Sequence, residues 1–269
     1  MADLEREYYE SDSFWGGNMV QDEANQLRIQ LTLNMLTNDI KSLIDVGCGN
    51  GVFIHKVQEH NPLIDITGVD RSNTALKYVK AAIVNSSLEN IPLETKAYDC
   101  VTCLQVIEHL PVNIYEKGLD ELARLSSKYI IVSVPNNEVL EDSYTKCPNC
   151  KSIFNREMHL RSFTKEKIEQ LFQSRGFKCT KIVTTGRGES FLGYKQYQKV
   201  FYPEQLLKWK SPLCPVCGYS DETNLELISV PLNQKQPKRK LISYLSYLPK
   251  LIWPKVYSDY WAIAHFERI

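Results

Sequence analysis

The chain has 269 residues, and its 32 lysine and arginine residues balance 32 aspartate and glutamate residues. A net charge of zero excludes a whole-chain positive field of the kind that recruits nucleic acid. The sequence contains no secretion signal and no run of about 18 apolar residues, so we expect a cytoplasmic protein without a transmembrane helix. Because the cytosol reduces disulfides, we expect the eight cysteines to be thiols or metal ligands.

The N-terminal part of the chain predicts a helical cap over residues 1–40. Its helix is expected at 22–37, where Leu27, Leu31 and Met35 recur at helical spacing. Aromatic side chains precede this helix, namely Tyr8, Tyr9, Phe14 and Trp15.

From Ser42 onward, short apolar runs alternate with helical patterns. This alternation is typical of a parallel sheet with right-handed crossovers, so the sequence predicts an α/β fold with a doubly wound, Rossmann-like sheet. The expected strands are 42–47, 64–69, 81–86, 99–105, 129–134, 177–185 and 260–266, and the expected helices are 51–60, 73–80, 114–126 and 164–175.

A glycine-rich loop follows the first expected strand. Residues 45–51 read Asp-Val-Gly-Cys-Gly-Asn-Gly, and a single acid, Asp70, ends the second strand. Such glycines let the backbone turn tightly against a ligand, and an acid at the second strand end can accept both hydroxyls of a ribose. The pair predicts an adenosine-containing cofactor. A dinucleotide fingerprint needs G-x-G-x-x-G, whereas this loop is G-x-G-x-G with Val52 at the third glycine position, which disfavours NAD.

The loop and three later motifs resemble those of the class I S-adenosylmethionine-dependent methyltransferases related to quinone-biosynthesis enzymes. The later motifs are Ser87–Pro92, Tyr98–Thr102 and Val106–Leu110, and the resemblance extends over about residues 40 to 185. It implies S-adenosylmethionine as the cofactor and a seven-stranded sheet whose last strand is antiparallel. The aromatic N-terminal segment would then either pack over the cofactor or fill the edge of the sheet.

The resemblance also implies the cofactor-binding residues. Asp45 and the backbone of the glycine loop would face the methionine part, Asp70 the ribose, and Gln105 with Val106 the sulfonium. Ser87 and Leu88 would flank the adenine, although similar enzymes commonly have an acid in place of Ser87. The full expected set is Asp45, Gly47, Cys48, Gly49, Gly51, Asp70, Arg71, Ser87, Leu88, Gln105 and Val106.

Two C-P-x-C pairs have the form of zinc knuckles. They are Cys147–Cys150 and Cys214–Cys217, and together they would supply four thiolates to one structural Zn²⁺. Because the pairs lie far apart in the sequence, two unrelated thiol pairs or a redox role stay as alternatives. A third pair, Cys100 and Cys103, lies in an expected buried strand and is interpreted as two core cysteines.

Two histidines are candidates for a catalytic base that removes a proton from an acceptor hydroxyl. His109 follows the fourth expected strand on the cofactor edge of the sheet, where the resembled family often has Glu-His. His159 lies between the first cysteine pair and the next helix. Packing or helix capping is the alternative for His109, and Arg161 could pair with an anionic acceptor.

The segment 231–257 carries six basic residues and no acid. Its Leu241, Tyr244, Leu245 and Leu248 recur at helical spacing, so 235–255 could contact an anionic membrane peripherally, at the inner face. The alternative is a helix of a substrate domain with solvent-exposed lysines.

The expected domain organisation is the cap at 1–40, a methyltransferase core at 41–185 plus 259–269, and insertions at 140–160 and 186–258 that form a zinc-stapled substrate or lid region. The predicted function is methyl transfer to a small or medium acceptor, such as a sugar or a lipid-linked glycan hydroxyl. An RNA- or protein-binding zinc protein with a methyltransferase fold, and a NAD-dependent oxidoreductase, are the competing hypotheses; the zero net charge disfavours nucleic acid as a partner.

Overall fold

The computed structural model describes residues 9–10, 15, 23–191, 207–209, 213–219 and 254–269. Contacts divide the chain into two compact units. Unit 1 comprises residues 1–138, 160–186 and 259–269, and unit 2 comprises residues 139–159 and 187–258. The basic segment 231–257, with its possible membrane contact, lies almost entirely outside the described residues. Within the described residues, every helix is too short or too polar to span a bilayer.

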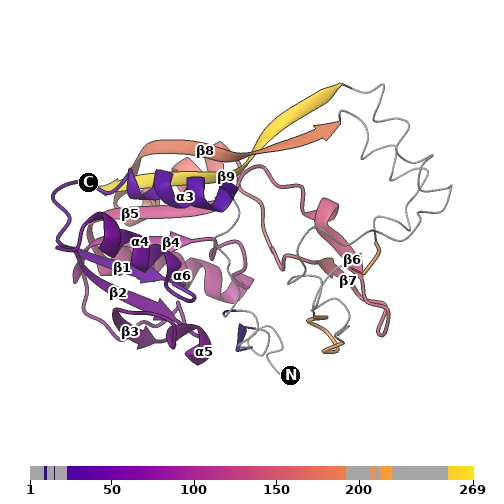
Figure 1. The fold of residues 1–269 in the computed structure, drawn as a ribbon, viewed down its shortest axis with the longest axis horizontal. Coiled ribbons are helices and arrows are strands. Elements are labelled where there is room, and N and C mark those ends of the chain that lie inside the picture. Colours follow the sequence, from indigo (N-terminus) through magenta and orange to yellow (C-terminus); the bar gives the residue numbers. More distant parts are fainter. Residues whose placement is uncertain (1–8, 11–14, 16–22, 192–206, 210–212, 220–253) are drawn as a thin grey trace. The chain divides into compact units, whose positions relative to one another are not determined.

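Unit 1 is built around a seven-stranded sheet with the strand order β3-β2-β1-β4-β5-β9-β8 (Figure 1). Strands β1 to β5 are parallel, whereas β9 runs antiparallel to β5 and pairs Ile131 with His265. The predicted doubly wound sheet with an antiparallel last strand is therefore confirmed. The strands are β1 (Ser42–Val46), β2 (Asp65–Asp70), β3 (Ala82–Asn85), β4 (Tyr98–Leu104), β5 (Ser126–Pro135), β8 (Phe177–Phe191) and β9 (Lys255–Arg268).

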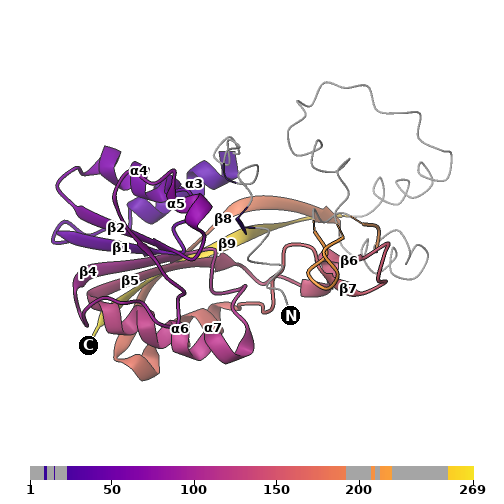
Figure 2. The same ribbon diagram turned by 90° about the horizontal axis from the view of Figure 1, so that it is seen from below.

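Helices cover both faces of this sheet (Figure 2). One face carries α3 (Glu23–Leu33), α4 (Val52–His60) and α5 (Asn73–Leu76), and the other carries α6 (Val112–Leu125) and α7 (Lys165–Gln170). Successive side chains of a strand point to opposite faces of the sheet, so each buried strand contributes residues to two hydrophobic cores, one on each face. Cys100 and Cys103 show this directly, because each is fully buried in a different one of the two clusters, as expected for core cysteines.

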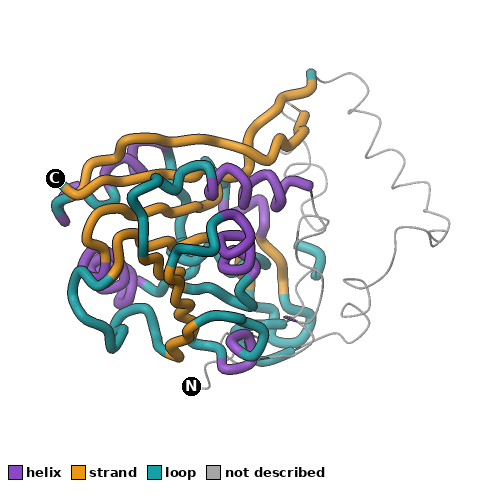
Figure 3. Tube along the Cα trace, turned by 60° about the vertical axis from the view of Figure 1, so that its left-hand side comes forward, coloured by secondary structure: helices purple, strands orange, loops and turns teal. Residues whose placement is uncertain are grey.

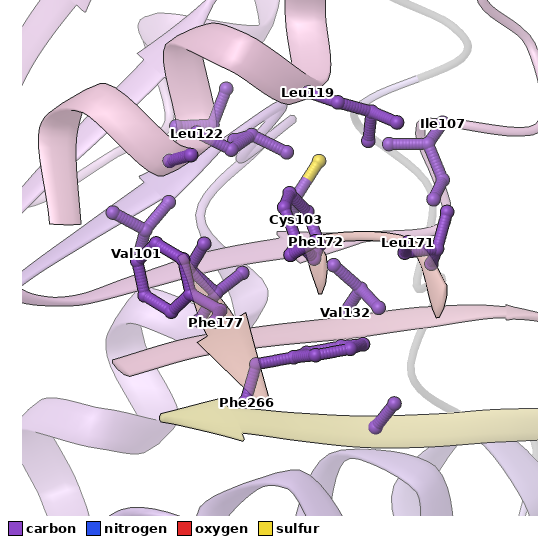
Figure 4. Packing of buried hydrophobic residues seen from close by; sticks show 14 of the residues in the cluster. Val101, Cys103, Ile107, Leu119, Leu122, Val132, Leu171, Phe172, Phe177 and Phe266 are labelled. Atoms are coloured by element: carbon purple, nitrogen blue, oxygen red, sulfur yellow. The ribbon is translucent and has the colours of Figure 1, made fainter. Parts of the chain in front are cut away.

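The core beneath α6 and α7 is the aromatic one (Figure 4). Phe172 packs edge-on against Phe266 of β9, with ring centroids 5.0 Å apart, and against Phe177 of β8 at 6.3 Å. Leu119 and Leu122 of α6 close this core from above, and the sulfur of Cys103 points towards them. These contacts fix the far edge of the sheet to the parallel half that carries the cofactor motifs.

Several elements end at other residues than the sequence pattern predicts. The helix predicted at 73–80 ends at Leu76, because Tyr78 and Val79 donate to carbonyls three residues back and tighten the chain into a turn. The helix predicted at 164–175 becomes α7 followed by a 3₁₀ turn, Gln173–Arg175, and stops at Gly176, whose φ is 80°.

The last two strands are longer than predicted. β8 and β9 lie side by side (Figure 3) and continue through polar residues that have no apolar run to mark them. The excursion expected at 186–258 is correspondingly shorter.

The described part of unit 2 contains a small hairpin. Strands β6 (Tyr144–Lys146) and β7 (Ile153–Asn155) pair antiparallel, and the first cysteine pair lies in the loop between them. A 3₁₀ helix, Leu140–Ser143, precedes the hairpin.

His265 gives unit 1 a titratable group inside the sheet. Its Nδ1 lies 2.7 Å from Thr180 Oγ1, while its buried Nε2 has no hydrogen-bond partner among the described residues. Burial lowers the pKa of His265. Because the pKa is lower in the folded state, the neutral histidine contributes its full share to the free energy of unfolding above the unfolded-state pKa of about 6.5. This contribution is lost as the pH falls below that value.

We therefore expect His265→Asn to lose less unfolding free energy between pH 7 and pH 5 than the wild type does, as measured by denaturant titration at both pH values. The exposed His60, at the end of α4, provides the control His60→Asn. An acid-induced loss of the same size in wild type and His265→Asn would contradict this assignment.

Candidate functional site

A pocket opens at the carboxyl ends of the parallel strands of unit 1, where doubly wound sheets bind their ligands. It encloses about 860 Å³, including open solvent at its mouth. Its walls come from the ends of β1, β2 and β4, the loop after β3, and the N-terminal segment. They comprise Tyr9, Trp15, Val46, Gly47, Val69, Asp70, Arg71, Ser86, Ser87, Leu88, Glu89, Gln105, Val106, His109, Leu110, Pro111 and Ile114.

The glycine-rich loop follows β1, and its first glycine, Gly47, lines the pocket. Gly47, Gly49 and Gly51 have φ values of 77°, 53° and 79°, a left-handed conformation that favours glycine. Space requires glycine as well, because a Cβ at Gly47 would lie 2.4 Å from Val106 Cγ2, and one at Gly49 would lie 2.7 Å from the ring of Trp15. The loop is tied to β2, where Gly47 N donates to Val69 O at 2.7 Å.

Asp70 ends β2 with its carboxylate fixed by the backbone. Gly49 N donates to Oδ2 at 2.9 Å, and Ser72 N donates to Oδ1 at 2.8 Å. Burial raises the pKa of Asp70, and these two hydrogen bonds act in the opposite direction. Each carboxylate oxygen keeps a second acceptor position, so the side chain can still receive two hydroxyls from a ligand in the pocket.

The wall after β3 contains an acid, Glu89, that was not among the expected cofactor residues although it lies inside the motif Ser87–Pro92. Ser87 Oγ donates to the carboxylate of Glu89, and both residues line the pocket together with Leu88. Similar enzymes commonly have an acid at the position of Ser87, and here Glu89 supplies a carboxylate two residues later. The sequence signal for Glu89 is its position in the motif Ser87–Pro92.

The wall after β4 combines a strained residue with a histidine. Gln105 has a φ of 60°, rare for a residue with a side chain, and is held there by bonds from its backbone N to Ser133 O (2.9 Å) and from Nε2 to Ser133 Oγ (3.2 Å). His109 also lines the pocket, and its Nε2 lies 4.0 Å from Oε1 of the fully buried Glu108. Strain of this kind is typical of functional sites.

Two N-terminal aromatic residues complete the pocket. Tyr9 and Trp15 both line it, and Trp15 Nε1 donates to Tyr9 O at 2.6 Å. Asn50, within the glycine loop, donates from Nδ2 to Trp15 O at 3.1 Å. For Tyr9 and Trp15, the structure therefore favours packing against the pocket over filling the edge of the sheet, whereas Tyr8 and Phe14 lie outside the described residues.

A buried carboxyl group, that of Asp45, lies at the end of β1 next to the glycine loop. Asp45 accepts a hydrogen bond from Thr102 Oγ1 at 2.7 Å, and burial raises its pKa to about 7. Arg28, on α3, stacks on the ring of Trp261 with its guanidinium carbon 5.6 Å from the ring centroid, and its charge lowers the pKa of Asp45. Arg28 also donates to Ser133 Oγ at 3.3 Å, the same hydroxyl that Gln105 contacts. The helical pattern of α3 did not distinguish Arg28 from a surface arginine.

The expected cofactor residues divide into two groups. Those that line the pocket are Gly47, Asp70, Arg71, Ser87, Leu88, Gln105 and Val106. The pocket lining does not include the other four, which are Asp45 of β1 and three residues of the glycine loop, Cys48, Gly49 and Gly51. Of the two candidate bases, His109 lines the pocket, while His159 belongs to unit 2 and its role stays a prediction.

Unit 2 brings the two C-P-x-C pairs together. The four Sγ atoms lie within 4.8 Å of one another, with Cys147 to Cys217 and Cys150 to Cys214 both at 3.7 Å. Sulfurs at the corners of a tetrahedron, about 2.3 Å from a central Zn²⁺, would be about 3.8 Å apart. These cysteines therefore fit a closed, structural zinc site with no position for water.

The two cysteine turns have the same backbone construction. In the first, Cys147 N donates to Ser152 O, and Lys151 N donates to Cys147 O. In the second, Cys214 N donates to Tyr219 O, and Gly218 N donates to Cys214 O. The residue after the second cysteine is left-handed in both, with φ values of 62° for Lys151 and 70° for Gly218. Matching turns that aim two thiols at one point indicate a single shared centre rather than two unrelated pairs.

Comparisons with known proteins agree with this geometry. The sequence model of a methyltransferase domain family matches residues 21–182. The ubiquinone biosynthesis O-methyltransferase of Nitrosomonas europaea is 35% identical over 100 residues, which cover 33% of this chain and 42% of that protein. The enzyme of the same name from Coxiella burnetii (strain Dugway 5J108-111) is 28% identical over 96 residues, or 32% of this chain and 40% of that protein. The chain thus matches about two fifths of the length of these relatives.

Solved structures share the fold. Magnesium protoporphyrin IX methyltransferase from Synechocystis PCC 6803 with bound SAH is 18% identical, with a TM-score of 0.53 over 68% of this chain and 92% of that chain. The Burkholderia thailandensis 1,6-didemethyltoxoflavin-N1-methyltransferase is 15% identical, with a TM-score of 0.52 over 69% and 81%. Because the family model matches more than half of the chain and the sheet has the same architecture, this protein belongs to the class I S-adenosylmethionine-dependent methyltransferase family.

Proposed function

We propose that the protein transfers the methyl group of S-adenosylmethionine to a hydroxyl oxygen of a small or medium acceptor. The observation that carries this proposal is the convergence, in one pocket, of the left-handed glycine loop, the fixed carboxylate of Asp70 and a histidine. The first two suit an adenosine cofactor. The third gives the same pocket a group that can accept a proton near neutral pH.

The cofactor, when bound, supplies an activated methyl group on a sulfonium. The chain then has to hold donor and acceptor in line, which can contribute several kcal/mol to lowering the barrier. Asp70 would receive the ribose hydroxyls, and Ser87 with Glu89 would offer hydrogen-bonding groups to the adenine edge. Val106 and the bent backbone at Gln105 would define the wall beside the reacting centre.

His109 is the proposed general base. It lies on the pocket wall next to the position expected for the sulfonium, so its imidazole would take the hydroxyl proton as the new carbon–oxygen bond forms. The buried carboxylate of Glu108, 4.0 Å from His109 Nε2, would stabilise the imidazolium that results.

A hydroxyl acceptor is supported by the named relatives, which are O-methyltransferases of ubiquinone biosynthesis. The cysteine-containing insertions are the reason for proposing a sugar or a lipid-linked glycan as the molecule that carries this hydroxyl. A panel containing a catechol, a nucleotide sugar and a lipid-linked saccharide would separate these classes in an assay with isotopically labelled cofactor.

We expect His109→Gln to lower kcat on that acceptor by about 10²- to 10⁴-fold, the usual effect of losing a general base, while the Kd of S-adenosylhomocysteine changes less than threefold. His60→Gln, on the exposed end of α4, is the matched control and should retain full activity. A methylated nitrogen or carbon in the product would overturn the hydroxyl assignment. Absence of S-adenosylhomocysteine binding to the wild type, measured by calorimetry, would overturn the cofactor assignment.

A further inference from the structure

Helix α6 contains a buried glycine, Gly118, in the middle of its 14 residues. Glycine is the poorest helix former apart from proline, because it loses the most backbone freedom when it is fixed in a helix. Gly118 has an ordinary helical backbone without a positive φ, so its conformation does not require glycine. The reason for a glycine at this position therefore lies in the packing around it.

The space around Gly118 is too small for a side chain. A Cβ at position 118 would lie 2.2 Å from Leu88 Cδ2 and 3.2 Å from Leu110 Cδ1. Carbon atoms that are not bonded to each other pack at about 3.5 to 4.0 Å, so the first of these distances is impossible without movement. Leu88 Cγ, by contrast, would lie 3.6 Å from the added atom, which is an ordinary contact. The glycine chiefly makes room for the end of the Leu88 side chain.

Leu88 contacts both this helix and the pocket. It is 8% exposed and belongs to the core beneath α6, together with Ile91 and Leu119. Leu88 and Leu110 also line the pocket. Protein cores are closely packed and have few voids, so the space open to a displaced Leu88 side chain is that of the pocket.

From these contacts we infer that Gly118 is a positioning residue for the cofactor: the absence of a side chain there lets Leu88 pack against α6 and keeps the pocket open where the adenine would bind. Gly118 does not line the pocket and acts through Leu88. The inference rests on the proposed function, because it takes the pocket ligand to be S-adenosylmethionine and its adenine to lie beside Leu88.

Gly118→Ala should leave the fold intact and weaken cofactor binding. Alanine favours the helix, and the end of a leucine side chain can change its rotamer. The rotated Leu88 would then occupy volume that the adenine needs. Adding atoms to a well-packed site has a cost that corresponds to about a tenfold change in an equilibrium constant or more, so we expect the Kd of S-adenosylhomocysteine to rise by about tenfold.

Calorimetric titration of a double-mutant cycle would test the route through Leu88. Leu88→Val shortens the side chain to its γ carbons, which leave room for a Cβ at position 118. In the Leu88→Val background, Gly118→Ala should therefore change the Kd of S-adenosylhomocysteine by less than about twofold, because the two substitutions are coupled through one contact. Lys117→Ala, at an exposed neighbouring position of α6, is the matched control and should bind like the wild type.

A crystal structure of Gly118→Ala would show the displacement directly. We expect Leu88 to be rotated into the pocket while α6 keeps its place on the sheet. A shifted α6 with Leu88 in its present position would contradict the inference.

The possible results separate this inference from the proposed function. Wild-type affinity in Gly118→Ala, or an equal loss of affinity in the Leu88→Val background, would overturn the role of Gly118 while the cofactor assignment stands. Loss of the folded state in Gly118→Ala, measured by thermal unfolding without ligand, would also contradict it. If the wild type fails to bind S-adenosylhomocysteine, the proposed function fails first, and with it the inference that rests on it.

Discussion

Replacing Asp70 with asparagine should weaken the binding of S-adenosylmethionine and S-adenosylhomocysteine by about 10- to 100-fold. Two ligand hydroxyls would lose a charged acceptor, and hydrogen bonds to charged groups contribute about 1.5 to 3 kcal/mol each. The asparagine amide would in addition face either Gly49 N or Ser72 N, both of which donate to the wild-type carboxylate. One of these donors would lose its acceptor, so the glycine loop would also be held less firmly.

The measurement is calorimetric titration of both ligands into wild type and variant. Asp65→Asn is a matched control, because Asp65 is an exposed acid at the opposite end of the same strand. Thermal unfolding without ligand separates loss of contacts from loss of fold. Wild-type affinity in Asp70→Asn would show that the carboxylate does not bind the ribose, and the location of the pocket ligand would have to be reconsidered.

The architecture of unit 1 was accessible from the sequence because it depends on local patterns. Runs such as Leu43-Ile44 must be buried on both faces of the sheet, and alternation with helices then leaves few topologies. Element ends depend on less visible causes. The polar, exposed stretch at the start of β9 is a strand only through its pairing with another strand, and no local pattern signals it.

The pocket residues that could be predicted best are those whose position at a strand end follows from the spacing of a motif. Gly47 and Asp70 stand at strand ends, and the chemistry of their positions is visible in the spacing. The sequence pattern did not predict the residues that reach the pocket from distant segments of the chain. Arg28 looks like any helical arginine until α3 packs against the sheet, and Trp15 reaches the pocket through contacts with residues about 35 positions away.

The four-cysteine centre leads to the other large expected effect. The described residues of unit 2 form a short hairpin, a 3₁₀ helix and the two cysteine turns, and Trp209 packs against Phe154 and Tyr219 with ring centroids 6.0 Å and 5.3 Å apart. Small units of this kind gain most of their stability from a staple. Structural zinc supplies about 10 to 16 kcal/mol in comparable peptides, so its loss should unfold such a unit.

We therefore expect Cys214→Ser to reduce bound zinc from about one ion per chain to nearly none, and to abolish the near-ultraviolet circular dichroism contributed by the packed ring of Trp209. S-adenosylhomocysteine affinity should change less than threefold, because the pocket residues belong to unit 1. Turnover of the acceptor should fall much more if the insertions form the substrate region that the sequence predicts. Cys179→Ser, a cysteine of β8 outside the centre, should leave zinc content unchanged. Full zinc content in Cys214→Ser would show that the two cysteine pairs do not share one ion, whereas an equal loss of cofactor and acceptor binding would contradict a role confined to unit 2.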